Sequence, residues 1–290
     1  MDQGITGVTV TADTKIHADM LSKMLEAARR DVEHRKLSFP LEELKGRLSS
    51  RTGSRPFGEA LTRSGLSVIA EFKRQSPSAG QISNARLRDQ VRLYEENGAV
   101  ALSVLTDTEH FGGSLEDLRE ARSACDLPIL RKDFVVDSYQ LYEAAVNGAD
   151  AVLLIVRALS DDDLRSMYRQ ARDLDLDCLV EVHDEDELMQ ALDLDAEIIA
   201  INARNLDEAA LPGDFAIKKD LTFELMPRVP AGKTVVAASG ITKESELREL
   251  EDVGVDAVLI GSTFMAAENP AAIVRQFTGA PDGTREHDLP

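Results

Sequence analysis

The stretch that decides the fold spans residues 151–183 and reads AVLLIVRALSDDDLRSMYRQARDLDLDCLVEVH. It opens with an unbroken apolar run, residues 151–156, which is typical of a parallel strand covered on both faces. Ser160 then stands where a helix would be capped, and the three Asp residues after it suit the positive end of a helix dipole. A second apolar run, residues 178–183, follows. The stretch therefore predicts one strand–helix–strand unit of a parallel sheet.

The same alternation of strand and helix occurs eight times in the chain, which matches a (β/α)₈ TIM barrel of the α/β class. A doubly wound open sheet is the alternative, but it usually carries a Gly-rich phosphate loop after its first strand. Here the first strand is followed by Arg74-Gln75-Ser76-Pro77 instead, which favours the barrel. The predicted strands are residues 67–73, 101–106, 127–134, 151–156, 178–183, 198–204, 234–240 and 257–264.

We predict that residues 1–290 form a single domain, with the barrel over residues 66–279. Residues 16–48 have the apolar spacing of a helix, with Ile16, Met20 and Met24 at four-residue steps, and we expect them to pack over one end of the barrel. Residues 280–290 are polar and interrupted by Pro and Gly, so we expect a disordered tail.

Charge dominates the composition, with 52 acidic against 33 basic residues and a formal net charge of −19. Such an excess destabilises a compact chain by self-repulsion unless salt screens it, and molar salt shortens the Debye length to roughly 3 Å. We interpret the charge as that of a protein from a salt-rich cytoplasm, as in a halophilic archaeon. An acidic mesophilic protein is the alternative that composition leaves open.

Composition also excludes several classes of partner. No apolar run is long enough to cross a bilayer, and residues 1–14 lack the basic start and apolar stretch of a signal peptide. Nucleic acid is a poor partner for this negative charge, because phosphate attracts clustered Lys and Arg. Cys125 and Cys178 show no metal-ligand spacing and are interpreted as buried free thiols in a reducing cytoplasm.

Several predicted strands end in charged or polar residues, although the strands are otherwise apolar. In a barrel, the carboxyl ends of the strands form the active-site mouth, and alternation decides which side chains face it. On the third strand, this puts Lys132 on one face with Leu130 and Phe134, while Arg131 and Asp133 take the other face for structural pairing. The polar residues expected at the mouth are Glu71, Lys73, Lys132, Glu181, Asn202 and Arg204.

Buried charges on four strands are costly and rarely needed for stability, so together they predict acid–base chemistry rather than structural ion pairs. His183 and His110 are weaker candidates, and we expect His183 to be a hydrogen-bonding residue at a strand end. The last two strands end in small residues, Ser239-Gly240 and Gly261-Ser262, whose free backbone N–H groups suit a phosphate. Lys73 and Arg204 could supply the neutralising charge.

Taken together, these motifs resemble the indole-3-glycerol phosphate synthase family from the N-terminal helix to about residue 278. Motifs on six strand ends in the right order make the resemblance highly specific. They are AEFKRQSPS (70–78), SVLT (103–106) with FGG (111–113), LRKDF (130–134), LVEVH (179–183), INAR (201–204) and IGS (260–262).

The resemblance implies closure of the indole ring of 1-(2-carboxyphenylamino)-1-deoxyribulose 5-phosphate, with loss of CO₂ and water, in tryptophan biosynthesis. Lys132 would be the acid, with Leu130 and Phe134 against the aromatic ring. Glu181 would be the base, assisted by Glu71 and Lys73. The remaining roles that it implies are hydroxyl binding by Asn202, closure over the substrate by Ser76 and the segment 75–83, and phosphate binding by Lys73, Arg204, Ser239, Gly240, Gly261 and Ser262.

By the same resemblance, the enzyme needs no cofactor and no metal, and it acts on a small phosphorylated molecule. Separately, we expect a monomer or weak homo-oligomer in the cytoplasm. One position departs from the family pattern, because Ala238 stands where the family usually has Glu.

Two alternatives to this function remain. The first is another phosphate-binding barrel, such as a phosphoribosylanthranilate isomerase, although Cys178 begins its strand rather than ending it. The second is a catalytically inactive barrel that serves as a binding subunit, with Ala238 as its only support.

Overall fold

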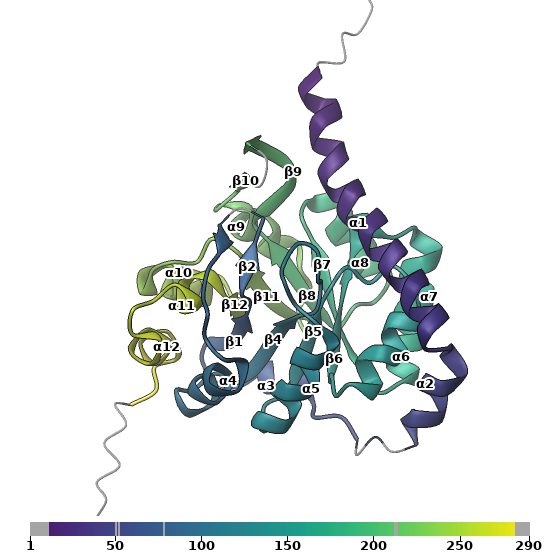
Figure 1. Ribbon diagram of the computed structural model, residues 1–290. Helices are drawn as coiled ribbons and strands as arrows, with labels where there is room; N and C mark the ends of the chain where they lie inside the picture. The colour runs from purple at the N-terminus through teal and green to yellow at the C-terminus, as the bar shows by residue number, and fades with distance from the viewer. Residues whose placement is uncertain (1–11, 50, 52, 78, 212–213, 282–290) are drawn as a thin grey trace, which may run out of the picture.

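A computed structural model describes residues 12–49, 51, 53–77, 79–211 and 214–281, and the side chains of these residues except 12–19 and 205–216. Eight parallel strands pair in a closed ring, which confirms the predicted barrel (Figure 1). The ring follows the order β1-β12-β11-β8-β7-β6-β5-β4. The strands are β1 (Ser67–Phe72), β4 (Ala101–Leu105), β5 (Ile129–Lys132), β6 (Ala151–Ile155), β7 (Asp177–Val182), β8 (Ile198–Asn202), β11 (Thr234–Ala238) and β12 (Ala257–Ile260).

Helices follow the strands and cover the outside of the ring (Figure 1). Ser160 caps its helix as predicted, with its hydroxyl accepting the Asp163 N–H at 3.2 Å. The covering helices are α4 (Leu87–Glu96), α5 (Leu115–Ala124), α6 (Tyr139–Val146), α7 (Asp161–Asp173), α8 (Glu185–Asp193), α9 (Leu221–Leu225), α10 (Glu244–Asp252) and α12 (Pro270–Thr278), with the 3₁₀ turns η1 (Val156–Ala158) and η2 (Met226–Arg228).

The eighth strand is shorter than predicted, because β12 ends at Ile260 and the next residues form α11 (Ser262–Met265). The apolar run that continues through Phe264 explains the error. A short apolar run suits a strand and a buried helix equally well. In the helix, the Phe264 ring packs against the Phe277 ring at a centroid distance of 5.6 Å.

The N-terminal segment forms two helices rather than one, α1 (Ala12–Ser38) and α2 (Leu41–Leu48). Pro40 separates them, since a proline disfavours helical geometry in the preceding residue. Met24 of α1 is buried and borders the mouth of the barrel. Ile16 belongs to the predicted apolar spacing, but its side chain is not among those that the structure describes. At the opposite end, α3 (Phe57–Leu61) packs the fully buried Phe57 against the barrel interior.

Helix α1 is fixed to the barrel by buried charges behind β5. Arg35 of α1 pairs with Glu143 of α6 at 2.7 Å. Glu143 in turn lies 3.3 Å from the guanidinium of Arg131, whose side chain is only 1% exposed. Arg131 also pairs with Asp133 at 2.8 Å, as the sequence predicted for these two residues. The chain of contacts runs from the helix over the mouth to the strand that carries Lys132.

Two hairpins lie at the mouth end of the barrel, after β1 and after β8. The first pairs β2 (Gln75–Ser76) with β3 (Gly80–Gln81), and the second pairs β9 (Arg204–Leu211) with β10 (Asp214–Ile217). In Figure 1, the second hairpin rises beside the N-terminal half of α1. Among the described helices, none is long and apolar enough to span a membrane.

Candidate active site

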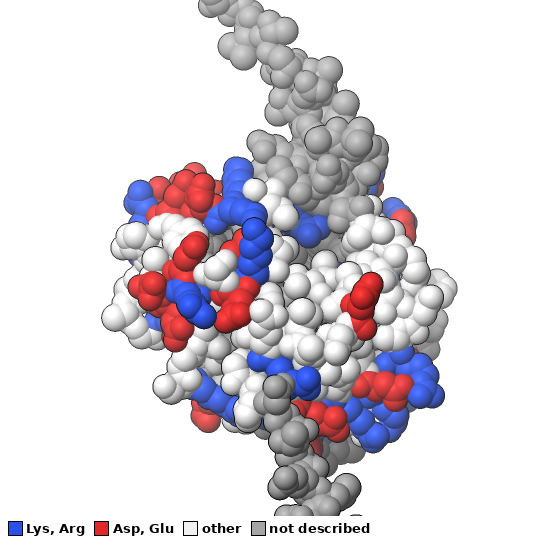
Figure 2. All heavy atoms as spheres, turned by 90° about the vertical axis from the view of Figure 1, so that its left-hand side faces the viewer, with Lys and Arg blue, Asp and Glu red and all other residues white. Residues whose placement is uncertain are grey.

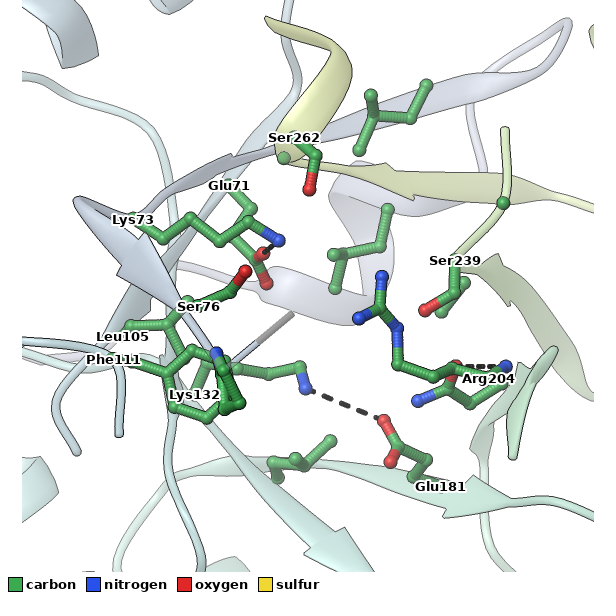
Figure 3. A pocket seen from close by; sticks show the side chains of 18 of the residues that line it. Glu71, Lys73, Ser76, Leu105, Phe111, Lys132, Glu181, Arg204, Ser239 and Ser262 are labelled. Atoms are coloured by element: carbon green, nitrogen blue, oxygen red, sulfur yellow. Dashed lines mark hydrogen bonds and ion pairs between the residues drawn. The ribbon is translucent and has the colours of Figure 1, made fainter. Parts of the chain in front are cut away.

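A pocket opens at the carboxyl ends of the strands, and each of the eight strands contributes at least one residue to its wall (Figure 3). The polar groups come from β1, β5, β7 and β8 and the residues just after them, whereas Leu153 and Ile155 of β6 and Leu259 of β12 supply apolar surface. Side-chain alternation explains this arrangement, because every second residue of each strand points inward and the last inward residues meet at the rim.

Lys132 and Glu181 meet at one wall of the pocket, on β5 and β7, which are separated in the ring by β6. The Lys132 Nζ lies 3.6 Å from the Glu181 Oε2 (Figure 3). The Glu181 side chain is 2% exposed and that of Lys132 is 18% exposed, so the carboxylate lies at the wall and the ammonium extends into the opening. Phe134 is buried beside Leu130, and both belong to the apolar cluster inside the barrel.

Glu181 is ionised in this environment. Burial opposes the charge, but the Lys132 ammonium, the His183 ring and the Asn202 side chain together hold the pKa of the carboxyl well below its usual range. His183 Nε2 lies 3.3 Å from Glu181 Oε1, on the side away from Lys132. The carboxylate is therefore available as a proton acceptor in the resting pocket.

A second pair, Glu71 and Lys73, lies at the end of β1, with 3.2 Å between Lys73 Nζ and Glu71 Oε1. Ser103 of the neighbouring β4 donates its hydroxyl to Glu71 Oε2 at 3.3 Å. The carboxylate packs so closely on Gly261 that a Cβ there would lie 2.5 Å from Glu71 Oε1. Gly261 therefore needs to be glycine, because any side chain would displace Glu71.

The turn after β11 borders the pocket, with Ser239 and Gly240 in its wall. Both residues have positive φ angles, 69° and 78°. A left-handed non-glycine residue such as Ser239 is typical of functional sites. Gly261 and Ser262 begin α11 after the next strand, which places both small-residue turns on one side of the pocket (Figure 3). Arg204 extends its guanidinium into the same space, and its backbone N–H donates to the Asn202 Oδ1 at 3.0 Å.

The structure brings together all the predicted site residues except Leu130. These are Glu71, Lys73, Ser76, Lys132, Phe134, Glu181, Asn202, Arg204, Ser239, Gly240, Gly261 and Ser262, which all line the pocket. Leu130 is fully buried in the apolar cluster below, and is not among the residues of the pocket wall.

Several residues of the pocket wall were not expected from the sequence. Met24 comes from α1 and Ile217 from β10, and no periodicity within the barrel places either residue at the mouth. Asp107 follows β4 and uses its carboxylate to accept the His110 and Phe111 N–H groups at 2.6 and 3.1 Å. Phe111 belongs to the FGG motif (111–113), which is part of the family resemblance. That motif was the signal in the sequence that could have placed Phe111 at the site.

Comparison with known proteins gives a consistent family. The family model described as indole-3-glycerol phosphate synthase matches residues 21–277. An indole-3-glycerol phosphate synthase of a Nocardioides species is 43% identical over 264 residues, covering 90% of this chain and 98% of the relative. That of Aquifex aeolicus is 43% identical over 241 residues, covering 82% of this chain and 91% of the relative.

Solved structures support the fold alone. Thiamine phosphate pyrophosphorylase from Pyrococcus furiosus matches with a TM-score of 0.56 at 18% identity, covering 77% of this chain and 96% of that one. KGPDC from Streptococcus mutans matches with a TM-score of 0.55 at 16% identity, covering 74% and 97%.

The turn after β11 gives the first prediction, because Glu246 of α10 holds it in place. The carboxylate accepts the Thr242 and Lys243 N–H groups at 2.7 and 2.9 Å and pairs with Lys219 at 2.9 Å. Burial opposes its ionisation, but these partners lower the Glu246 pKa from 4.5 to about 2. A lowered carboxyl pKa stabilises the fold above the unfolded-state value, and this contribution is lost as the pH falls from about 4.5 toward 2.

Glu246→Gln is therefore expected to lower the free energy of unfolding most at pH 6, and progressively less toward pH 3. Urea unfolding of both proteins at several pH values measures the difference. Glu249→Gln, on the exposed face of the same helix, shows the effect of losing a surface charge. A Glu246→Gln difference that is constant from pH 6 to pH 3 would contradict the assignment.

Proposed function

The chain belongs to the indole-3-glycerol phosphate synthase family, and we propose how its pocket residues divide the work of that reaction. The enzyme is a carboxy-lyase of tryptophan biosynthesis: it closes the ring of 1-(2-carboxyphenylamino)-1-deoxyribulose 5-phosphate and releases CO₂ and water. The observation that carries the proposal is the facing pair of Lys132 and Glu181, 3.6 Å apart at the wall of the pocket.

Lys132 is the proposed acid of ring closure. A carbon of the aromatic ring attacks the substrate carbonyl, and the developing alkoxide needs a proton as the bond forms. The Lys132 ammonium extends from β5 into the pocket, with the buried Phe134 ring following on the same strand end to support the aromatic ring of the substrate. The carboxylate then leaves as CO₂, and its bonding electrons restore the aromatic system.

Glu181 is the proposed base of the dehydration that follows. Forming the final double bond removes a proton from the carbon adjacent to the one that bears the hydroxyl, while an acid protonates the hydroxyl, which leaves as water. Glu181 is ionised and can accept the first proton, and the Glu71–Lys73 pair assists from the other side of the pocket. Asn202, between these groups and the phosphate turns, is proposed to bind substrate hydroxyls.

The phosphate is proposed to bind on the side of Ser239, Gly240, Gly261 and Ser262, where two turns supply backbone N–H groups and Lys73 and Arg204 supply positive charge. Ser76 lies at the start of the hairpin after β1, is buried and borders the pocket. This position supports a role for the segment 75–83 in closing over the substrate and excluding water. The proposed mechanism needs neither a cofactor nor a metal.

The alternatives find less support. A phosphoribosylanthranilate isomerase uses a Cys and an Asp as its acid–base pair, so it would need a thiol at the mouth. Cys178 lies near the start of β7, away from the mouth, and burial raises the pKa of its thiol well above its usual range. An inactive barrel would have no need for the buried charge of Glu181 at the mouth, or for the Lys132 ammonium that extends into the pocket beside it.

We further propose that the enzyme acts in the cytoplasm as a monomer or weak homo-oligomer, without a nucleic-acid partner. Figure 2 shows one face of the molecule, on which acidic and basic side chains are intermixed. The described residues of this face form no broad basic area of the kind that binds a phosphate backbone.

The net charge of −19 supports an origin in a salt-rich cytoplasm, as in a halophilic archaeon. We expect the melting temperature to rise between 0.1 and 2 M KCl, because screening relieves the repulsion among the 52 acidic residues. Sucrose strengthens apolar burial without screening charge, so a parallel series in sucrose separates the two effects. A melting temperature that is flat or falls with KCl would indicate an ordinary acidic protein.

Lys132→Met keeps the apolar stem of the side chain and removes its proton. A positioned acid contributes about 10²–10⁴ in rate, so kcat is expected to fall by at least a hundredfold. The appearance of indole fluorescence from the carboxyphenylamino substrate measures the rate. Lys45→Met, on α2 and far from the mouth, is the control for loss of a lysine. Activity of Lys132→Met within tenfold of the parent would refute the assignment.

Ala238→Glu tests the departure from the family pattern. Among the described residues of the pocket wall, four carboxylates stand against three cations: Glu71, Asp107, Asp133 and Glu181 against Lys73, Lys132 and Arg204. A fifth carboxylate is expected to raise KM severalfold by repelling a substrate with a phosphate and a carboxylate, and to change kcat by less than tenfold. Ala238→Gln adds similar volume without charge. A rise in kcat of more than tenfold for Ala238→Glu alone would mean that the missing carboxylate limits catalysis.

A further inference from the structure

His183 lies directly behind the proposed base, outside the pocket wall. It follows the end of β7, its side chain is 2% exposed, and its two ring nitrogens face two different carboxylates. Nε2 lies 3.3 Å from Glu181 Oε1, and Nδ1 lies 3.2 Å from Glu187 Oε2. A neutral imidazole carries one N–H and one lone pair, so one carboxylate would face a lone pair. Only the imidazolium presents a proton and a positive charge to both neighbours; the Nδ1 contact is a hydrogen bond, whereas the Nε2 contact is an ion pair without hydrogen-bond geometry.

Glu187 is itself held firmly. Its carboxylate accepts the backbone N–H of His183 at 2.8 Å and pairs with Arg157 of η1 at 2.5 Å. Arg157 also pairs with Asp184 at 3.1 Å. Charges of alternating sign therefore extend outward from the pocket through the barrel wall, in the order Lys132, Glu181, His183, Glu187 and Arg157.

We propose that His183 is a positioning residue for Glu181, holding one carboxylate oxygen against the barrel wall as an imidazolium and leaving the other to face Lys132 and the substrate. This inference rests on the proposed role of Glu181 as a base. The two contacts of Glu181 support it, because Oε1 is nearest His183 while Oε2 is nearest Lys132. In the proposed reaction Lys132 gives up its proton, and His183 then remains as the cation beside Glu181.

The charged groups around His183 agree with its protonation. Burial disfavours the imidazolium and Arg157 opposes it, but Glu181 on β7 and Glu187 on α8 outweigh both and raise the His183 pKa. Lys132 on β5 faces the far side of Glu181, and Asp184 on the turn before α8 is paired with Arg157. Because the coupling between two sites is reciprocal, the His183 charge that lowers the Glu181 pKa implies an equal effect of Glu181 on His183.

The first experiment measures this coupling without any activity. The chain has five histidines, so the imidazole signals in an NMR titration are few, and the one lost in His183→Gln is that of His183. We expect His183 in the parent protein to titrate above the ordinary histidine value of 6.5, and at a lower pH in Glu181→Gln. The same titration midpoint in both proteins would overturn the proposal.

The second experiment measures the consequence for catalysis. Gln at position 183 keeps a donor near Glu181 but removes the charge, so the acid limb of the kcat–pH profile is expected to move upward by about 1–3 pH units. His34→Gln, exposed on α1, is the control and leaves the limb in place. A residue that only supported the fold would lower the melting temperature or the active fraction without moving the limb, and that result would overturn the proposal.

The two experiments distinguish failure of the inference from failure of the proposed function. If Lys132→Met is inactive but His183→Gln keeps the parent acid limb, the function stands and the positioning role is wrong. If Lys132→Met remains active, the proposed mechanism is wrong, and the NMR titration still decides whether His183 and Glu181 form a coupled pair.

Discussion

The site depends on one geometric constraint, the closure of eight parallel strands into a ring. In a closed ring, the inward-facing side chains of all strands point toward one common axis. The last inward residues of the strands therefore share one rim. Lys132 and Glu181 lie far apart in sequence, yet their strands β5 and β7 are separated only by β6 and the two side chains meet at 3.6 Å. Closure adds the Glu71–Lys73 pair of β1, which lies opposite β7 in the ring and so faces Glu181 across the mouth.

The same constraint explains why so much of the site could be predicted from sequence. Alternation along an extended strand is rigid, so the positions of Glu71 and Glu181 follow once their strands are recognised. The prediction is less complete where the chain leaves the strands. Met24 reaches the pocket from a helix that is fixed through Arg35 and buried charges, and no local pattern encodes that docking. The end of β12 was also missed, because apolarity alone does not distinguish the strand from the short helix after it.

The turns at the phosphate side show how shape and charge are fixed together. Gly261 is pressed against the carboxylate of Glu71, so the backbone that would bind an anion lies next to a negative side chain. Lys73 pairs with that carboxylate at 3.2 Å and so offsets its charge. With Ala238 in place of the family's Glu, the mouth carries one carboxylate fewer beside Asn202, its partner in the strand register. The loss makes the pocket more favourable for an anionic substrate, whatever it does to the chemistry.

A carboxylate stabilised by two cations is a weak base, which at first conflicts with the role proposed for Glu181. In the proposed mechanism the conflict disappears, because one of the two cations is temporary. Lys132 would donate its proton during ring closure, and the electrostatic stabilisation of Glu181 from that side would be lost with it. The carboxylate would then become more basic when dehydration needs a base. His183, paired on its far side with Glu187, would keep its charge, so Glu181 would remain oriented while its basicity rises. In this proposal Lys132 faces the pocket and can lose its proton early, whereas His183 faces the wall and stays charged. The placement of these two cations therefore sets the order of the chemical steps.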